Sequence, residues 1–466
     1  MALHVMLLYF TTFIIFTIGN RVYVHPFHFF AYNKSICTEM EKQNQSTHEE
    51  KVFIPISVET DDSPEQKNLK SINSLETQSL DVKDIPKVTY LTELMKDLGF
   101  RYFSVLTNMH KSETVLLSPT NIYATLVSFY LGASKQTSTE LQLFLGFTTP
   151  SECTSRVDGH KVLSVLKTID DLLLSKQADI DASRLTCLFT APGIHLSKTF
   201  VQDLVPSSDA LYVKAVNFTN PTRAKELINS FFESRIARKS NTILTTDNPS
   251  TINLLFASYI HFKVTVKNAF QVNQPQDFWI DSNKKISVPM ITITGMFNYK
   301  SDDKENLSVI HIPLSKNDFL LLVQPTNGNS LDRIESSLSR DSFPIWLGKM
   351  SNRYLNLTLP KLRIESCYNF QEILRNMNVS TLLGENADYS KISDAHLNIG
   401  KVINKIHFEL DGSRTENEQP QDDSQQNAGL VPLEIKMDRA FLMAVFEGIS
   451  KALLFFGRVI YPLNAL

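Results

Sequence analysis

Apolar residues take up a regular helical spacing from near Val88, which marks the start of the folded body. They recur every three or four positions, at Leu91, Leu94, Leu98, Tyr102 and Val105. Side chains at this spacing share one face of an α-helix. The pattern therefore predicts a long amphipathic helix with one buried face.

Two shorter helices are predicted next. An apolar run around Phe129 predicts a helix that ends at Gly132, because glycine tolerates the left-handed conformation past a helix end. Another helix is expected from Thr137 to Leu145, since Thr137 and Glu140 have the spacing of a capping box.

Short runs of apolar residues further along the chain are typical of strands. They are Leu185–Phe189, Tyr212–Val216, Val309–Ile312 and Phe319–Val323. Residues 224–236 predict one more helix. Helices interspersed with strands in this way indicate an α+β fold. No polar linker interrupts residues 88–466, so we expect one large domain.

The segment from residue 30 to residue 87 has a different composition. Gln, Asn, Ser, Thr, Glu and Asp dominate it from Ala31 onward, with little periodicity. Such a segment buries too little apolar surface to offset its chain entropy, so we predict a loosely ordered tail. Its one apolar patch, Val52–Ile56, is the part expected to dock on the body. A loose tail would leave the residues before it within reach of a protease.

A hydrophobic leader opens the chain. Leu7–Ile18 is apolar apart from threonines, and it is shorter than the roughly 20 residues that span a bilayer. Thr17 and Gly19 are the small residues that a signal peptidase requires, which predicts a signal peptide over residues 1–19 cut before Asn20. A retained signal-anchor is the alternative. No later stretch would stop transfer, so we expect a secreted, extracellular protein.

Composition argues against several function classes. The net charge of −3 and pI near 6.4 favour neither nucleic acid nor an anionic membrane as a partner. His48-Glu49-Glu50 lacks the second histidine of a zincin helix, and there is no phosphate-binding loop or nucleophile elbow. We therefore predict no enzymatic activity and no catalytic, metal-binding or cofactor-binding residues.

The four cysteines are Cys37, Cys153, Cys187 and Cys367. Four cysteines allow three complete pairings, and the spacing does not choose among them. Cys187 lies in a predicted strand, where a buried free thiol is expected.

Six Asn-X-Ser/Thr sequons are candidate glycan sites in a secreted protein. They are Asn33, Asn44, Asn217, Asn306, Asn356 and Asn378.

The ten residues that follow the leader form a recognisable peptide. Residues 20–29 read Asn-Arg-Val-Tyr-Val-His-Pro-Phe-His-Phe, and this sequence resembles the angiotensin family of vasoactive peptide hormones. The resemblance implies cleavage by the aspartic protease renin between Phe29 and Phe30. It also implies a second cut, by angiotensin-converting enzyme, between Phe27 and His28. An edge strand is the structural alternative for this segment, because an edge tolerates Pro26.

The same resemblance assigns roles to residues of the released peptide. Contacts with angiotensin receptors are implied for Arg21, Tyr23, His25 and Phe27. Pro26 biases His25 toward an extended conformation and so shapes the carboxyl end of the peptide. The implied function is a hormone precursor that regulates blood pressure and salt balance.

The body resembles the serpin family from about residue 88 to the end. The motifs that carry this resemblance occur in the family's order and include Leu117–Pro119, Gly132–Thr137, Ser287–Met290, Leu359–Ser366, Ala387–Ser393 and Leu454–Pro462. It implies mixed β-sheets surrounded by helices. It also implies a disulfide between Cys37 and Cys153.

Inhibitory serpins trap a protease by inserting a cleaved loop into a sheet, and this loop is poorly suited to that step. The strand Val402–Leu410 leads into Gly412-Ser413, which resembles the family's hinge, but the alanine-rich run that should follow is missing. Insertion would turn inward the side chains of Ser413, Thr415, Asn417 and Gln419. Each buried amide without a partner costs about 1–3 kcal/mol, and Pro420 removes a donor from a central strand. We predict that the body is not an inhibitor; a serpin-type serine protease inhibitor is the alternative.

Overall fold

The computed structural model describes most of the predicted body and part of the segment before it. The described residues are 27–45, 53–54, 85–174, 179–204, 210–236, 242–244, 252–281, 283–326, 330–339, 341–414 and 431–464. The leader, the Gly19–Asn20 bond, residues 20–26 of the decapeptide and residues 415–420 of the loop lie outside this range.

Helices and strands alternate through the described chain. The helices are α2 (Phe27–Phe30), α3 (Lys34–Gln45), α4 (Ile85–Met109), α5 (Pro119–Gly132), α6 (Lys135–Phe144), α7 (Gly159–Leu174), α8 (Lys198–Leu204), α9 (Pro221–Arg235), α10 (Leu331–Ser336), α11 (Ser342–Leu347) and α12 (Phe370–Asn376), with short 3-10 turns at Cys153–Ser155 and Ser380–Leu383.

The strands are β1 (Phe53–Ile54), β2 (Val115–Leu117), β3 (Ile180–Thr190), β4 (Leu196–Ser197), β5 (Ala210–Ala215), β6 (Leu254–Gln271), β7 (Gln276–Trp279), β8 (Lys285–Val288), β9 (Met290–Asp302), β10 (Leu307–Pro313), β11 (Phe319–Pro325), β12 (Ser351–Pro360), β13 (Leu362–Asn369), β14 (Ile399–Arg414), β15 (Leu433–Lys436), β16 (Phe441–Phe446), β17 (Leu453–Val459) and β18 (Leu463–Asn464). The four strands and the helices predicted in the body are all present, with boundaries shifted by a few residues.

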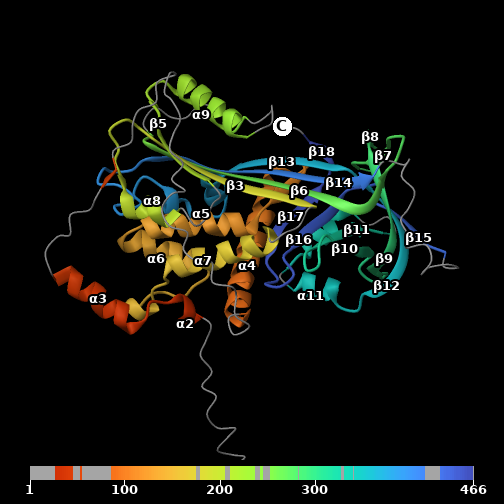
Figure 1. The fold of residues 1–466 in the computed structure, drawn as a ribbon, viewed down its shortest axis with the longest axis horizontal. Coiled ribbons are helices and arrows are strands. Elements are labelled where there is room, and N and C mark those ends of the chain that lie inside the picture. Colours follow the sequence, from red (N-terminus) through yellow and green to blue (C-terminus); the bar gives the residue numbers. More distant parts are fainter. Residues whose placement is uncertain are drawn as a thin grey trace, which may run out of the picture.

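One long strand layer organises the body. Strands β13, β14, β6, β3 and β5 lie side by side, and β6 then pairs with β9, which leads into β10, β11, β16, β17 and β2. Figure 1 shows α9 over one face of the long strands, with α5, α6 and α7 on the other. The fold is α+β, as predicted.

Buried polar side chains tie the central helix to the two middle strands. Almost every residue of α5 is buried. Ser258 of β6 donates to Asn121 of α5 over 2.9 Å, and Asn121 in turn donates to Asn404 of β14. Because a buried amide needs partners, these bonds fix α5 against the sheet.

Strands β6 and β14 are parallel neighbours along almost their whole lengths. Their pairing runs from Leu254 with Ile399 to Phe270 with Arg414, with irregularities near both ends. A strand inserted between them would have to replace all of these bonds. Over the described residues, β6 and β14 therefore leave no gap for an additional strand.

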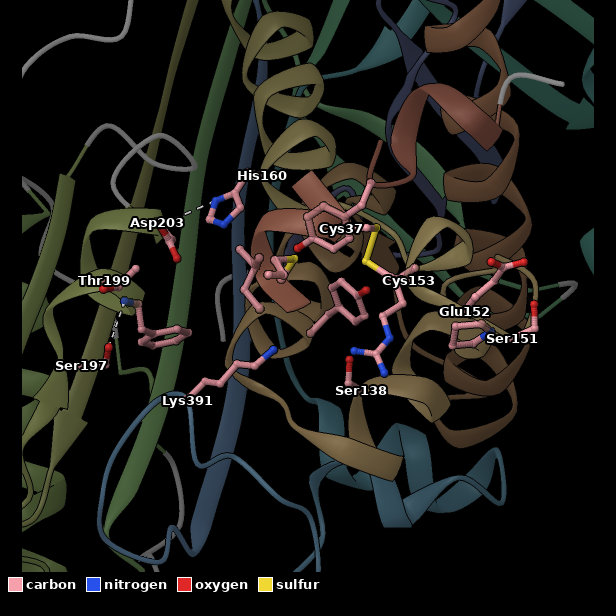
Figure 2. Close-up of a pocket in the computed structure, with 17 residues that line it drawn as sticks. Cys37, Ser138, Ser151, Glu152, Cys153, His160, Ser197, Thr199, Asp203 and Lys391 are labelled. Atoms are coloured by element: carbon pink, nitrogen blue, oxygen red, sulfur yellow. Dashed lines mark hydrogen bonds and ion pairs between the residues drawn. A yellow bond between two sulfur atoms is a disulfide. The ribbon is translucent and has the colours of Figure 1, made fainter. Parts of the chain in front are cut away.

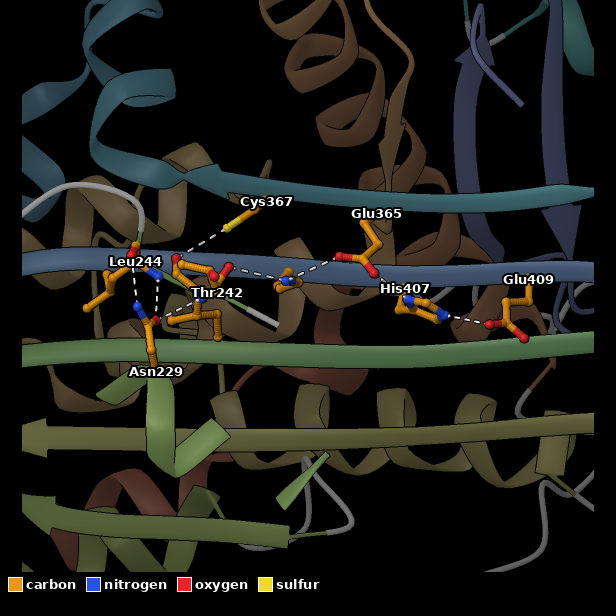
Figure 3. Close-up of polar contacts among 9 residues, drawn as sticks. Asn229, Thr242, Leu244, Glu365, Cys367, His407 and Glu409 are labelled. Carbon is orange, nitrogen blue, oxygen red and sulfur yellow. Dashed lines mark hydrogen bonds and ion pairs between the residues drawn. The ribbon is translucent and has the colours of Figure 1, made fainter. Parts of the chain in front are cut away.

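A row of charged residues is buried on the α9 face of this sheet (Figure 3). The Lys405 ammonium pairs with Glu365 at 3.4 Å and donates to the Thr242 carbonyl at 3.2 Å. His407 lies between Glu365, at 3.2 Å, and Glu409, at 2.8 Å. Burial by itself raises the pKa of Glu365, but the hydrogen bond from His407 and the charge of Lys405 bring it below its usual value.

The amide of Asn229 connects α9 to the same region. Its oxygen accepts from the Ile243 and Leu244 N–H groups at 3.0 and 2.9 Å, and its nitrogen donates to the Leu244 carbonyl. Residues 242–244 are thus held on one side by α9 and on the other by Lys405 of β14. These contacts attach α9 firmly to the sheet.

Two details of the predicted helix ends were wrong. Gly132 does end α5, but its backbone is not left-handed; an added Cβ would lie 2.3 Å from Ile392, so close packing explains the glycine. Helix α6 begins at Lys135, two residues earlier than expected. Thr137 does not form a capping box there, because its hydroxyl accepts from the Asp388 N–H.

The prediction of a loosely ordered tail does not hold for residues 34–45, which form α3. Asn33 begins this helix, since its side-chain oxygen accepts from the Ile36 N–H at 2.8 Å. Within the apolar patch, β1 pairs with β4 of the body, as the docking hypothesis expected. The polar composition of the segment gave no indication of helix α3, which is ordered.

Two of the cysteines, Cys187 and Cys367, remain free thiols in the body. Cys187 is a fully buried free thiol, as predicted, and burial raises its pKa well above the usual value. Cys367 is also free and only partly buried. None of the described helices is long and apolar enough to cross a membrane.

The close packing at Gly132 gives a stability prediction. Gly132→Ala should lower the free energy of unfolding by about 1–3 kcal/mol, because Ile392 or α5 must shift to admit a methyl group. Urea unfolding would measure the loss. Gly295→Ala is the matched control: the nearest atom, in Phe297, lies 3.5 Å away, so its effect should stay within about 0.5 kcal/mol. Equal unfolding midpoints for the two variants would contradict this account.

Candidate cleavage site

The end of the decapeptide-like segment is a single helical turn, α2, rather than an extended chain. The Ala31 N–H donates to the Phe27 carbonyl at 3.1 Å, which closes the turn. Phe27 and Phe30 are three positions apart and therefore share one face. That face is turned to the body: Phe27 is 9% exposed and Phe30 is 0% exposed.

An aromatic cluster receives the two phenylalanines. The Phe147 ring centroid lies 6.1 Å from that of Phe27 and 6.4 Å from that of Phe30. Tyr90 of α4 completes the cluster, 6.5 Å from Phe30 and 6.4 Å from Phe147. Gly146, with φ of +89°, makes the sharp turn after α6 that directs Phe147 toward the cluster.

The residues that flank the predicted scissile bond differ in exposure. His28 is exposed and Phe29 is half-buried, with the Lys87 ammonium 4.3 Å from the centre of its ring. Phe30, on the other side of the bond, is fully buried. Aspartic proteases bind extended chains, so the expectation of a freely reachable Phe29–Phe30 bond was wrong for this conformation.

Backbone hydrogen bonds hold the residues just after the bond. The Asp158 N–H donates to the Phe30 carbonyl at 2.6 Å, and the Tyr32 N–H donates to the Arg156 carbonyl at 3.1 Å. Lys161 donates to the Ala31 carbonyl at 3.1 Å. Residues 30–32 thus lie antiparallel to residues 156–158, with Ala31 opposite Val157.

A disulfide fixes the same segment a few residues later. Cys37 of α3 is bonded to Cys153, with their Cα atoms 5.8 Å apart. This is the pairing that the family resemblance implies. Cys153 lies three residues before Arg156, so the covalent bond and the hydrogen bonds connect the same two stretches of chain.

These contacts make detachment of α2 energetically costly. Burying one phenylalanine side chain stabilises a fold by about 1.5–3 kcal/mol. With two such side chains and three hydrogen bonds, the detached form is a small minority of molecules at equilibrium. In this structure the predicted scissile bond is therefore held in a helical turn that is packed against the body.

The spacing of Phe27 and Phe30 was a signal for this turn that sequence reasoning missed. Two aromatic residues three positions apart are typical of a helix face. Lys87, Tyr90, Phe147, Asp158 and Lys161 could not be found in the same way, because they come from three separate regions of the chain. The predicted receptor-binding residues Arg21, Tyr23 and His25 lie outside the described residues.

The start of the predicted protease-trapping loop is also structured. Asp411 pairs with Lys361 at 2.6 Å. Gly412 packs closely on β6, since an added Cβ would lie 2.9 Å from the Ala269 carbonyl oxygen. The predicted hinge residues Gly412 and Ser413 therefore continue β14.

The candidate glycan sites differ in exposure. Asn33, Asn217 and Asn378 are exposed, whereas Asn306 is partly buried. The partly buried side chain of Asn356 donates through its nitrogen to Glu434 at 2.9 and 3.0 Å, which occupies the atom that would carry a glycan. The side chain of Asn44 lies outside the described residues.

Comparison with protein families gives one match, which covers most of the chain. Residues 93–462 match the model described as Serpin (serine protease inhibitor). Among the described residues there is no group of three or more His, Cys, Asp or Glu side chains placed to hold a metal ion.

Angiotensinogens are among the relatives that this chain matches over nearly their full length. Angiotensinogen from Bos taurus is 38% identical over 96% of this chain and 95% of its own, and that from Rattus norvegicus is 36% identical over 97% and 96%. Angiotensinogen from Homo sapiens is 34% identical over 96% and 95%.

Solved structures share the fold at lower identity. Human thyroxine-binding globulin complexed with thyroxine has a TM-score of 0.68 at 22% identity, covering 81% of this chain and all of that one. Uncleaved ovalbumin has the same TM-score and identity, covering 80% and 100%.

The aromatic cluster gives a prediction about the attachment of α2. Phe147→Ala leaves the decapeptide sequence intact but removes its main apolar partner, at a cost of about 3–5 kcal/mol for a buried phenylalanine. This loss makes the detached state of α2 more populated. Amide hydrogen exchange at Ala31, Tyr32 and Asp158 should therefore become at least tenfold faster than in wild type.

Phe343→Ala is a control of equal size, because Phe343 is buried among Phe100, Phe446 and Phe456 in another part of the core. It should lower global stability without a selective effect on residues 31, 32 and 158. Unchanged exchange at these residues in Phe147→Ala would show that the cluster does not hold α2.

Proposed function

This chain belongs to the serpin family and is similar over about 96% of its length to angiotensinogens, and on that basis we propose that it is a secreted hormone precursor. Its body is not an enzyme. After removal of residues 1–19, cleavage between Phe29 and Phe30 by renin releases the decapeptide Asn20–Phe29. A second cut between Phe27 and His28, by angiotensin-converting enzyme, leaves an octapeptide.

The octapeptide is the vasoactive form in this proposal. Arg21, Tyr23, His25 and Phe27, the last with its new carboxylate, contact angiotensin receptors. The effect is regulation of blood pressure and of salt and fluid balance. The observation that carries the proposal is a hormone-like sequence whose last three residues lie in a turn that the body buries through Phe27 and Phe30.

The body acts as a carrier that limits access to the bond. An aspartic protease binds about eight extended residues, a span of roughly 25 Å at the rise of a β-strand. Residues 27–30 are helical and Phe30 is buried, so α2 must detach and extend before the bond enters a protease. Release then depends on how often residues 27–32 leave the body.

The alternative function, inhibition of serine proteases, has less support. The paired strands β6 and β14 would have to separate along their length, and Lys405 and His407 would lose their packed surroundings. Insertion of the loop would then bring the polar side chains predicted to turn inward, Ser413, Thr415, Asn417 and Gln419, into the sheet. Burial of these groups costs free energy where the family's inhibitors bury small side chains.

Digestion of the full-length protein tests the function. Renin should release one peptide with the mass of Asn20–Phe29, measured by mass spectrometry. The chain holds two other Phe-Phe bonds, Phe231–Phe232 in α9 and Phe455–Phe456 in β17, which serve as internal controls. These should stay intact, because opening them requires loss of a whole helix or a central strand. Cleavage at these bonds but not after Phe29 would contradict the proposal.

The inhibitor alternative is tested on the same protein. Serine proteases of trypsin-like and chymotrypsin-like specificity should cut the chain without forming a covalent complex. A complex that survives denaturing electrophoresis would establish inhibition instead.

We further propose that the Cys37–Cys153 bond sets the rate of release. A disulfide that closes a long loop restricts the detached state, and typical bonds stabilise by about 2–4 kcal/mol. Cys37→Ser should therefore raise the initial rate of renin cleavage by about tenfold or more, measured from timed peptide release. Cys367→Ser is the control, since this thiol is free and distant in sequence from the site. An unchanged cleavage rate and an unchanged affinity for renin in Cys37→Ser would contradict this role of the disulfide.

A further inference from the structure

The two residues that flank the predicted cleavage bond both contact the first turns of α4. The Lys87 ammonium lies 4.3 Å from the centre of the Phe29 ring, and the centre of the Tyr90 ring lies 6.5 Å from that of Phe30. Lys87 and Tyr90 are three positions apart in α4, so they share one face of this helix. That face therefore meets the chain on both sides of the bond.

The contact before the bond differs in kind from the contacts after it. The chain after the bond is held by the disulfide at Cys37 (Figure 2) and by the hydrogen bonds along residues 156–158. The Phe29 side chain, before the bond, contacts the Phe30 ring, whose centre lies 5.0 Å away, and the Lys87 ammonium. Phe30 belongs to the same turn, α2. The Lys87 ammonium therefore connects the Phe29 ring to the body.

A lysine at this point does not favour the helix in which it lies. Lys87 is the third residue of α4, and the first turn of α4 contains no acidic residue. The positive end of the helix dipole lies there, so a cation in this turn is unfavourable. The Phe29 ring offsets part of this cost, because the negative face of an aromatic ring attracts an ammonium. An aliphatic side chain at position 29 has no such face.

We propose that Lys87 is a positioning residue for the cleavage bond, which holds α2 on the body through an aromatic side chain at position 29. The body then distinguishes between chains that differ at this one residue, because an aliphatic side chain there lets α2 detach more often. A cation–π contact at a partly exposed site changes such an equilibrium about two- to fivefold. The effect of Lys87 on cleavage rests on the proposed precursor function, but its effect on α2 does not.

The test is a double-mutant cycle in the full-length, disulfide-bonded protein. Lys87 has a further interaction besides the Phe29 ring, so the lysine variant by itself does not isolate this contact. The readout is hydrogen exchange of the Ala31 amide, which donates to the Phe27 carbonyl and closes α2. Lys87→Met keeps a long side chain without the charge. It should speed this exchange about two- to fivefold when Phe29 is present, and by less than about 1.5-fold in the Phe29→Leu background.

Two further variants serve as controls. Lys87→Arg should exchange as wild type does, because a guanidinium also binds the face of an aromatic ring. Lys284→Met removes an exposed ammonium that lies 5.8 Å from the ring centre of Tyr461, and it should leave exchange at Ala31 unchanged. An equal effect of Lys87→Met in both backgrounds, or no effect in either, would overturn the proposal.

The consequence for cleavage is a change in KM and not in kcat. Renin binds the detached chain, so a larger detached fraction lowers KM, whereas the bound complex is the same for both proteins. Lys87→Met should therefore lower KM for release of Asn20–Phe29 about two- to fivefold with kcat unchanged, measured by mass spectrometry of timed digests.

The two measurements fail in different ways. Faster exchange at Ala31 with an unchanged KM would overturn the role of Lys87 in cleavage. If no variant releases the decapeptide but the exchange cycle gives the expected coupling, the precursor function is contradicted and the contact between Lys87 and Phe29 is established.

Discussion

The burial of the Phe30 side chain is the interaction on which the arrangement of the N-terminal segment depends. Phe30 has no exposed surface, and it contacts Phe147 and Tyr90 from two different parts of the body. Its carbonyl also accepts the short hydrogen bond from Asp158. One residue thus anchors α2 through its side chain and the following segment through its backbone. Phe30 also follows the proposed cleavage bond directly. The contacts that hold the bond against the body are therefore the same ones that must break before the peptide is released.

A large body is useful to a short peptide only if the body is rigid. The closed pairing of β6 with β14 and the buried contacts of Asn121 with Ser258 and Asn404 supply that rigidity at the centre. On the α9 face, the buried ion pair between Lys405 and Glu365 connects the sheet to residues 242–244. A buried ion pair gives little net stability, but breaking it leaves an uncompensated charge, so the contact resists opening of this face.

The N-terminal segment is attached by two kinds of interaction that respond to different conditions. The aromatic cluster depends on apolar burial, and the Cys37–Cys153 bond depends on redox state. Both act within the stretch from Phe27 to Cys37. Detachment of one stretch, residues 27–32, is therefore the step at which they combine.

Much of the fold could be predicted from sequence, because local periodicity reports which face of an element is buried. The spacing of Leu91, Leu98 and Tyr102 predicted α4, and the apolar runs at 185–189 and 319–323 predicted β3 and β11. Helix α3 was missed, since its polar composition carries little apolar periodicity. Gly132 was placed correctly for the wrong reason, because the close approach of Ile392 is a contact across 260 residues of chain.

The sequence by itself determined where the hormone-like peptide lies and which bond a protease is expected to cut, because that information is a contiguous string of residues. It could not determine whether the bond is accessible. Accessibility depends on Phe147, Tyr90, Asp158 and Lys161, which only tertiary folding brings to Phe30. Likewise, the choice of Cys153 as the partner of Cys37 arises from surfaces that meet in space and leave no local pattern.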